Sequence, residues 1–232
     1  MKNSCPLSPK PGVPDIPFLE NPRSVKKFRD LVLTYYRCYG RDLAWRKTTD
    51  PYHILVSEIM LQQTQVERVC RKYPEFIAAF PDFPTLAEAP LSDVLGVWQG
   101  MGYNRRAIAL QKCARRVVEE FGGTLPQDPD ILATFPGIGK ATAASICAFA
   151  FNRPVVFIET NIRTVFIHYF FKDTNPVHDT AILPLVEKTV DRKNPRVWYW
   201  ALMVLSVLGT IIYGSFAWLL AVQKKYENCR SP

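Results

Sequence analysis

The stretch FPGIGKATAA at residues 135–144 joins two helical patterns through a very short turn. Gly137 and Gly139 let the backbone approach a phosphate closely, and the amides that open the second helix point toward the anion. Lys140 adds a positive charge at the same place. The stretch therefore predicts a helix-hairpin-helix that binds the DNA backbone. The alternative is a plain turn between two helices.

Helical spacing of apolar residues recurs along most of the chain, with Gly and Pro between the segments. Only 155–158 has a β-like composition, and four residues cannot make a sheet. No repeat of fixed period is present. The chain is therefore predicted to be all-α. The expected helices are 22–39, 51–70, 76–80, 85–89, 92–98, 104–121, 129–135, 140–151, 161–171 and 179–190.

Composition and charge limit the possible classes. The 232 residues are 48% hydrophobic and 22% charged, which excludes a disordered or fibrous protein. Lys and Arg number 29 against 21 Asp and Glu, a net charge of +8 that favours a polyanion partner.

Six cysteines are spread widely, and the smallest separation, from Cys38 to Cys70, is 32 residues. This spacing fits neither zinc nor an iron–sulfur cluster, so we expect no metal and no [4Fe–4S] cofactor. The N-terminus lacks the apolar core of a signal peptide. Reduced thiols and a cytoplasmic location are the expectation.

An uncharged segment, 197–223, spans 27 residues. One or two buried helices, broken near Gly209 or Gly214, are the favoured interpretation. Its length also permits a C-terminal membrane anchor.

Two carboxylates stand out within apolar helical patterns. Glu58 lies on one helical face with Leu55 and Ile59, where an unpaired carboxylate tends to bind a proton. It is either a catalytic acid or a residue at the edge of the stripe that reaches water.

Glu159 precedes the helical pattern that begins near Asn161, where the helix dipole and free amides favour the ionised form. The alternative is ordinary capping by Thr160 or Asn161, with Glu159 incidental. If both carboxylates are functional, their pKa values should differ, one suited to give a proton and the other to stay negative.

Four motifs, in this order and spacing, resemble the helix-hairpin-helix DNA glycosylases of the HhH-GPD superfamily, with the MutY adenine glycosylases as the nearest branch and endonuclease III more distant. The motifs are SEIMLQQTQV at 57–66, VWQGMGYNRRA at 97–107, FPGIGKATAASI at 135–146 and ETNIRTV at 159–165. The resemblance covers about 41–203.

The resemblance implies a two-lobed all-α fold with a central cleft for DNA. The implied parts are a flexible Pro-rich arm over 1–21, a six-helix barrel over 44–153 that ends in the hairpin, and a second lobe made of 22–43 and 154–226.

The family pattern also implies roles for single residues. Glu58 would protonate the base, and Glu159 would stabilise the positive charge that develops on the sugar. The residues implied to contact DNA are Gln62, Gln63, Tyr103, Gly137, Gly139, Lys140 and Thr142.

Several positions depart from the family pattern. Glu159 stands where the family usually has Asp, and Ala141 stands where bifunctional members carry a lysine that forms a Schiff base. The four clustered cysteines of an iron–sulfur site and the C-terminal reader domain of MutY are absent from this sequence.

The expected function is that of a monofunctional glycosylase of base excision repair. It would act as a monomer on double-stranded DNA and remove a mispaired base, with adenine opposite guanine or 8-oxoguanine favoured. A thymine or uracil glycosylase for G·T or G·U mismatches is the close alternative, and a non-catalytic DNA-binding module is the alternative from another class.

Overall fold

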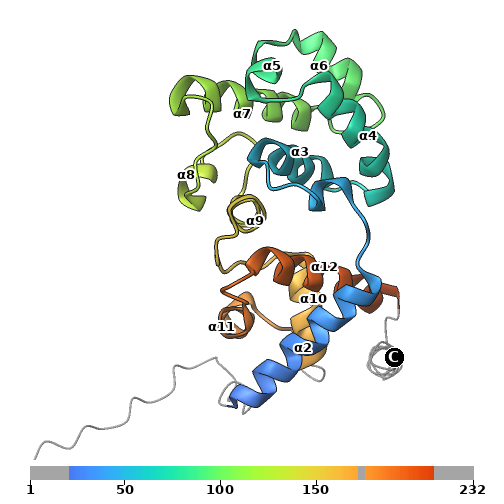
Figure 1. Cartoon of the computed structure of the whole chain (residues 1–232), viewed down its shortest axis with the longest axis vertical. Helices are drawn as coiled ribbons and strands as arrows, with labels where there is room; N and C mark the ends of the chain where they lie inside the picture. Colours follow the sequence, from blue (N-terminus) through green and yellow to red (C-terminus); the bar gives the residue numbers. More distant parts are fainter. Residues whose placement is uncertain (1–20, 172–175, 212–232) are drawn as a thin grey trace, which may run out of the picture. The chain divides into compact units, whose positions relative to one another are not determined.

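The computed structural model describes residues 21–171 and 176–211, with side chains up to residue 206 in the last helix. The predicted N-terminal arm and the part of 197–223 beyond residue 211 lie outside the described residues. Every regular element in the described ranges is helical, as Figure 1 shows. The all-α prediction is confirmed, and the β-like residues 155–158 form no strand.

The chain divides into two compact units. Unit 1 combines the N-terminal part up to Gly40, Val156–Asp191 and the chain from Val197 onward. Unit 2 consists of Arg41–Val155 together with Arg192–Arg196. The short segment 192–196 is assigned by the sequence to the second lobe, but Arg196 donates hydrogen bonds to the carbonyls of Phe149 and Ala150 in unit 2.

Unit 2 contains a short 3-10 helix and seven α-helices that surround one apolar core. In order they are η1 (Ala44–Arg46), α3 (Pro51–Leu61), α4 (Val66–Ala79), α5 (Phe83–Glu88), α6 (Leu91–Trp98), α7 (Arg105–Phe121), α8 (Pro129–Leu132) and α9 (Lys140–Phe151). Side chains of α3, α4, α6, α7 and α9 meet in a continuous buried cluster. Trp98 and Phe76 are fully buried there and pack edge to face, 5.7 Å between ring centroids.

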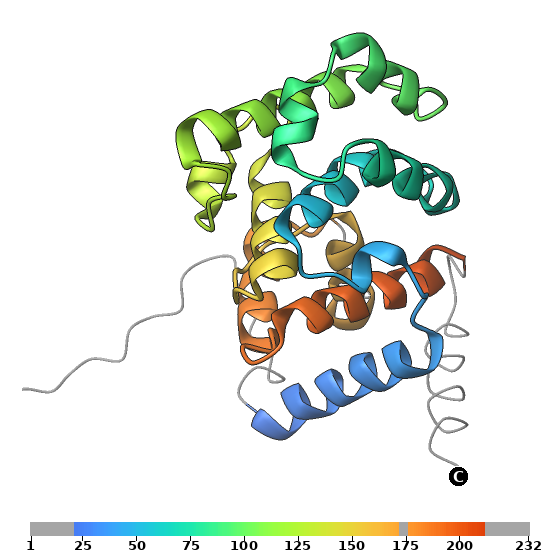
Figure 2. The same ribbon diagram turned by 45° about the horizontal axis from the view of Figure 1, so that its top comes forward.

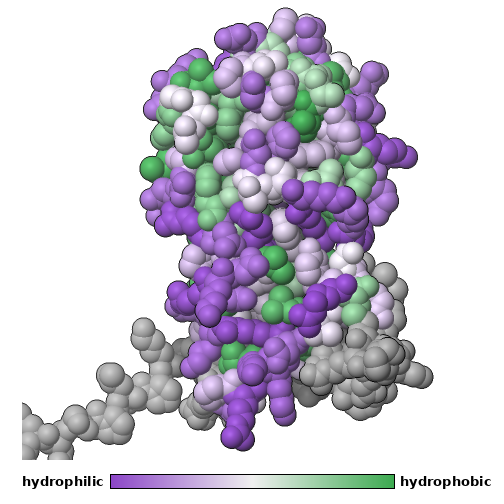
Figure 3. Space-filling model, in the orientation of Figure 1, coloured by the Kyte–Doolittle hydropathy of each residue, from purple (hydrophilic) through white to green (hydrophobic). Residues whose placement is uncertain are grey.

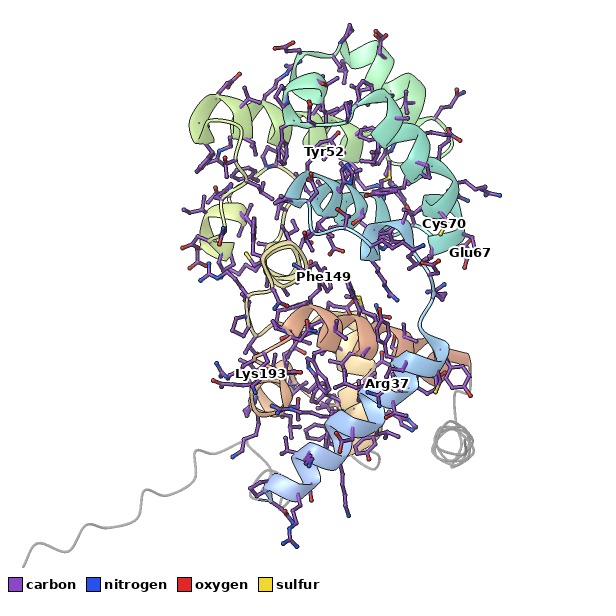
Figure 4. All side chains as sticks on the ribbon, in the orientation of Figure 1. Arg37, Tyr52, Glu67, Cys70, Phe149 and Lys193 are labelled. Atoms are coloured by element: carbon purple, nitrogen blue, oxygen red, sulfur yellow. The ribbon has the colours of Figure 1, made fainter. Side chains whose placement is uncertain are left out.

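Helix α3 is central to unit 2 and packs against both α4 and α9. Tyr52, labelled in Figure 4, donates its hydroxyl to the carbonyl of Phe80 at 2.5 Å and ties the start of α3 to the end of α4. Glu67 and Cys70, also labelled there, are exposed on α4. On the face of unit 2 in the upper part of Figure 3, hydrophobic side chains form separate patches among hydrophilic ones.

The single helix expected over 51–70 is wrong, because the chain breaks between α3 and α4. Gln62 is the C-cap of α3 and has left the helical region, with a ψ of 111°, and Gln63 has a left-handed φ of 54°. No Gly or Pro marks this break. The carbonyls at the end of α3 are instead bonded by a side chain from α7, which is described below.

Unit 1 is built from α2 (Pro22–Tyr39), α10 (Thr160–Phe170), α11 (Asp179–Thr189) and most of α12 (Pro195–Ile211). Figure 2 shows α2 running alongside α12. Phe28 of α2 lies at the centre, with ring centroids 5.8 Å from Phe166 and 5.9 Å from Trp198. Arg29 donates to the carbonyls of Thr189 and Val190 at the end of α11, both at 2.7 Å.

The uncharged segment begins as core of unit 1, since Trp198, Tyr199 and Leu202 of α12 are fully buried. Within the described ranges, no helix combines the length and apolar content that a membrane crossing needs.

Within the described residues, Cys70, Cys113 and Cys147 are free thiols. Burial raises the pKa of the Cys113 thiol to about 12 and that of Cys147 to about 11, so neither is a reactive thiolate near neutral pH.

Candidate active site and DNA-contacting loops

The hairpin of 135–144 has the geometry predicted from its glycines. Gly137 has a φ of 74°, and Gly139 is the N-cap of α9 with no side-chain hydrogen bond to the first turn. Because glycine has no side chain, Gly139 cannot cap the opening amides of α9, and Lys140, the first residue of the helix, is exposed. This arrangement suits an anion such as a backbone phosphate. The helix before the turn, α8, is shorter than expected and ends at Leu132.

Gly137 is required for close packing as well as for its φ. A Cβ at this position would lie 2.9 Å from the Cβ of Ala109 in α7. The carbonyl of Gly137 also accepts a hydrogen bond from Gln62 Nε2 at 3.1 Å. The hairpin is thus joined directly to the loop between α3 and α4.

Two loops with unusual backbone conformations meet beside the hairpin. Gln63 and Tyr103 both have left-handed φ values, 54° and 49°, and both are exposed. Non-glycine residues with positive φ are uncommon and often mark functional positions. A cavity of about 330 Å³ lies between the loops, and its lining residues are Gln62, Gln63, Tyr103, Arg105, Arg106 and Thr142. Four residues predicted to contact DNA are therefore brought together: Gln62, Gln63, Tyr103 and Thr142.

Arg106 holds both loops and was not singled out from the sequence. Only 6% of its surface is exposed. One terminal nitrogen donates to the carbonyls of Ile59, Met60 and Gln62, and the other donates to those of Met101 and Gly102. The detectable signal is that Arg106 shares the apolar face of α7 with Leu110, Cys113 and Val117. A charged residue on an apolar face needs polar partners, and the same argument applies to Glu58.

Glu58 lies near the C-terminal end of α3 and is half-buried. Its Oε2 accepts a hydrogen bond from Ser145 Oγ of α9 at 2.5 Å. Gln62, four residues further along, begins the loop that lines the cavity. The carboxylate is thus one helical turn from residues predicted to contact DNA.

Glu159 is itself the N-cap of α10, so the prediction that it lies at a helix N-terminus is confirmed. Its Oε1 accepts from the backbone amide of Ile162 and its Oε2 from Asn161 Nδ2, both at 3.0 Å. Ser206 Oγ of α12 donates to Asn161 Oδ1 at 3.0 Å and fixes which way that amide points.

The expected direction of the Glu159 pKa is wrong. Burial raises the pKa of this carboxyl above its ordinary value, and the hydrogen bonds from Asn161 and Ile162 offset this only in part. The helix N-terminus acts as predicted, but desolvation of the charge is the larger effect. Ionised Glu159 is consequently a poorly solvated negative charge that a nearby cation would stabilise.

Residues 56–187 match the family model described as HhH-GPD superfamily base excision DNA repair protein. The adenine DNA glycosylase of Buchnera aphidicola subsp. Baizongia pistaciae (strain Bp) is 37% identical over 169 residues, which are 72% of this chain and 47% of that protein. The human adenine DNA glycosylase is 37% identical over 150 residues, 61% of this chain and 28% of that protein. The chain thus spans about half the length, or less, of these relatives.

Solved structures give the same picture of the fold. A thermostable thymine-DNA glycosylase matches with a TM-score of 0.71 and 31% identity, covering 78% of this chain and 85% of that one. An endonuclease III trapped on DNA matches with a TM-score of 0.65 at 16% identity, covering 78% of this chain and 84% of that one. The helix-hairpin-helix glycosylase fold predicted from the motifs is confirmed.

Proposed function

The chain belongs to the HhH-GPD superfamily of base excision DNA repair proteins, and from this premise we propose that it is a DNA glycosylase that hydrolyses the N-glycosidic bond of a mispaired base in double-stranded DNA. Adenine opposite guanine or 8-oxoguanine is the proposed substrate. The protein would act as a monomer.

One observation carries the proposal: α3 presents the carboxyl of Glu58 one turn from a loop with a strained, exposed backbone. Gln63 and Tyr103 project from loops that a buried arginine holds in place, as suits residues that enter an opened duplex. Extruding a base from the stack requires a few kcal/mol, which contacts of this kind would supply. Glu58 would then donate a proton to the extruded base, so that the base leaves as a neutral molecule.

Glu159 is proposed to stabilise the sugar while the bond breaks. The positive charge that develops there would be attracted to a carboxylate that is poorly solvated when ionised. Because the pKa of Glu159 is raised, the ionised form is held at an energetic disadvantage until a cation forms beside it. The side chain of Glu is one methylene longer than that of the usual Asp, and Glu159 Oε1 accepts a hydrogen bond from the Ile162 amide as an N-cap.

A second candidate substrate has its own support. The thymine-DNA glycosylase structure is matched over 85% of its length at 31% identity, whereas the adenine glycosylases are matched over about half of theirs or less. Thymine or uracil opposite guanine is therefore the alternative substrate.

We propose that the enzyme lacks lyase activity. A lyase needs an amine placed to attack the sugar and form a Schiff base. Ala141 fills the position where the family resemblance would place that lysine, and Lys140 is exposed at the start of α9 beside the proposed phosphate site. Borohydride should therefore trap no covalent protein–DNA adduct, and efficient trapping that Lys140→Ala abolishes would contradict this proposal.

The decisive experiment uses duplexes with A·8-oxoG, A·G, G·T or G·U pairs, followed by alkali to cleave abasic sites. We expect excision from the A·8-oxoG and A·G duplexes. Glu58→Gln keeps the shape of the side chain but cannot donate the proton, so its rate should fall by about 10²–10⁴-fold or more, with duplex affinity within a few-fold. Excision from G·T or G·U alone would establish the alternative substrate. DNA binding without excision of any base would identify a non-catalytic module.

A further inference from the structure

Ser145 donates a hydrogen bond to the proposed acid Glu58, and the proposed reaction gives Ser145 no role. Ser145 lies in α9, is only 4% exposed, and sits in a run of small residues that lets α9 pack closely on α3. Its hydroxyl oxygen is 2.5 Å from Glu58 Oε2 and 2.9 Å from the carbonyl oxygen of Thr142. A hydroxyl has one proton, so it can donate to only one of these two oxygens at a time.

The carboxylate oxygen is the stronger acceptor of the two. It is closer, and hydrogen bonds to an ionised oxygen are shorter and about twice as strong as those between neutral groups. The Thr142 carbonyl, three residues earlier in the same helix, instead helps to fix the rotamer of the Ser145 side chain. Ser145 is therefore held in position to donate to Glu58.

We propose that Ser145 is a positioning residue for the acid Glu58, an inference that rests on the proposed function. By donating to Oε2, Ser145 makes Oε1 the oxygen that carries the transferable proton. That proton passes from Oε1 to the base, the N-glycosidic bond breaks, and its electron pair leaves with the base. Water then adds to the sugar and gives one proton to the Glu58 carboxylate, which restores the acid. Ser145 keeps its own proton throughout and stabilises the carboxylate that Glu58 becomes.

The hydrogen bond from Ser145 affects the pKa of the Glu58 carboxyl. A hydrogen bond donated to the ionised carboxyl favours that form and lowers its pKa. The half-buried position of Glu58 acts in the opposite direction. Two charged residues of the adjoining elements are retained in the variants that test the proposal: Arg106 of α7, which donates to the Met60 carbonyl at the end of α3, and Lys140 at the start of α9.

The test compares Ser145→Ala with a matched control, Cys147→Ala. Cys147 lies two residues further along α9, is fully buried, and donates its Sγ–H to the carbonyl of Gln127 at 3.1 Å. Each variant removes one heavy atom and one hydrogen bond to a carbonyl or carboxyl from the same helix, but only one of them touches Glu58. A loss of stability alone should therefore be similar in both.

At a pH low enough for Glu58 to be protonated in both proteins, we expect Ser145→Ala to reduce the single-turnover excision rate by about 10–100-fold, the effect of one hydrogen bond to the carboxylate that forms in the transition state, with duplex affinity unchanged. Carbon NMR of ¹³C-labelled glutamate should show the pKa of Glu58 raised by about one unit. Cys147→Ala should change neither quantity.

Either of two results would overturn the proposal: an unchanged excision rate in Ser145→Ala, or a slower rate with an unchanged Glu58 titration, which would assign Ser145 to helix packing. The titration needs no DNA. If the unmodified protein excises no base while the Glu58 pKa still shifts, the proposed function fails and the hydrogen bond stands. If excision occurs and the pKa does not shift, the inference about Ser145 alone fails.

Discussion

At the scale of single residues, Arg106 connects the two loops that line the cavity. Lysine at this position would keep the charge but could not reach five carbonyls with a single ammonium group. We expect Arg106→Lys to lower the free energy of unfolding by about 2–4 kcal/mol, because several buried carbonyls lose their donor. Excision should fall further than stability explains, since Gln63 and Tyr103 lose their support.

Urea unfolding measures the first effect, and the single-turnover excision rate measures the second. Arg105→Lys is the matched control, because Arg105 is the exposed neighbour of Arg106 on the same helix. Equal stability in the two variants would mean that the hydrogen bonds of Arg106 do not hold the loops.

Glu159 should make stability depend on pH in a specific direction. Its pKa is raised in the folded state, so the folded protein binds a proton more tightly than the unfolded chain does. The stability from this group is fully present below the ordinary pKa of 4.5 and is lost as the pH rises through the folded value. Glu159→Gln, which does not titrate, should therefore gain melting temperature relative to the unmodified protein between pH 4 and pH 7.

The quantity to compare is the melting-temperature difference between the variant and the unmodified protein at pH 4 and at pH 7. If the variant also loses the Asn161 hydrogen bond, that loss is the same at both pH values and does not affect the comparison. Excision should be nearly abolished in the same variant. A melting-temperature difference between the two proteins that stays constant from pH 4 to pH 7 would show that Glu159 titrates as an ordinary exposed carboxyl.

At the scale of elements, the hairpin depends on Gly137. Alanine there would adopt an unfavourable positive φ and would place its Cβ 2.9 Å from that of Ala109. We expect Gly137→Ala to lower stability by about 1–3 kcal/mol and to weaken binding to every duplex, because the turn and the start of α9 must shift.

Gly96→Ala is the control in the same unit. Gly96 lies within α6, and an added Cβ would meet nothing within 4 Å. Alanine favours a helix interior over glycine by about 1 kcal/mol, so this variant should be as stable as the unmodified protein or more so. Thermal melting and duplex titration distinguish the two glycines, and equal behaviour would remove the special role of Gly137.

Elements with local start and stop signals could be predicted from the sequence. The bounds expected for α2 and α9 agree with the structure, since Pro22 opens the first and Gly139 and Asn152 flank the second. The break between α3 and α4 could not be predicted, because the carbonyls at the end of α3 are bonded by Arg106, which lies more than forty residues away in the sequence. Ser145 could not be predicted for the same reason, because its partner Glu58 is 87 residues away in the sequence. Glu58, Gln62 and Gln63 were identifiable from a motif, whereas residues that act by supporting them are visible only in the packed structure.

At the scale of the whole molecule, the net charge of +8 sets the response to salt. Each phosphate contact releases condensed counterions, so duplex affinity should fall steeply with ionic strength. Lys140→Ala should weaken binding about equally for all duplexes and should reduce the slope of log affinity against log salt by about one. Fluorescence anisotropy over a salt series measures this slope. A loss confined to mismatched duplexes would mean that Lys140 contacts the lesion.

Unit 1 is assembled from segments that are far apart in the sequence, and this affects how the chain folds during its synthesis. Phe28 packs on Trp198, which is translated 170 residues later. At about 5–20 residues per second, that interval is roughly 10–30 seconds. Most of unit 2 leaves the ribosome as one continuous stretch during this time, whereas the apolar side of α2 has not yet met its partners. The nascent chain therefore carries an uncovered N-terminal helix through most of translation, the kind of surface that chaperones bind.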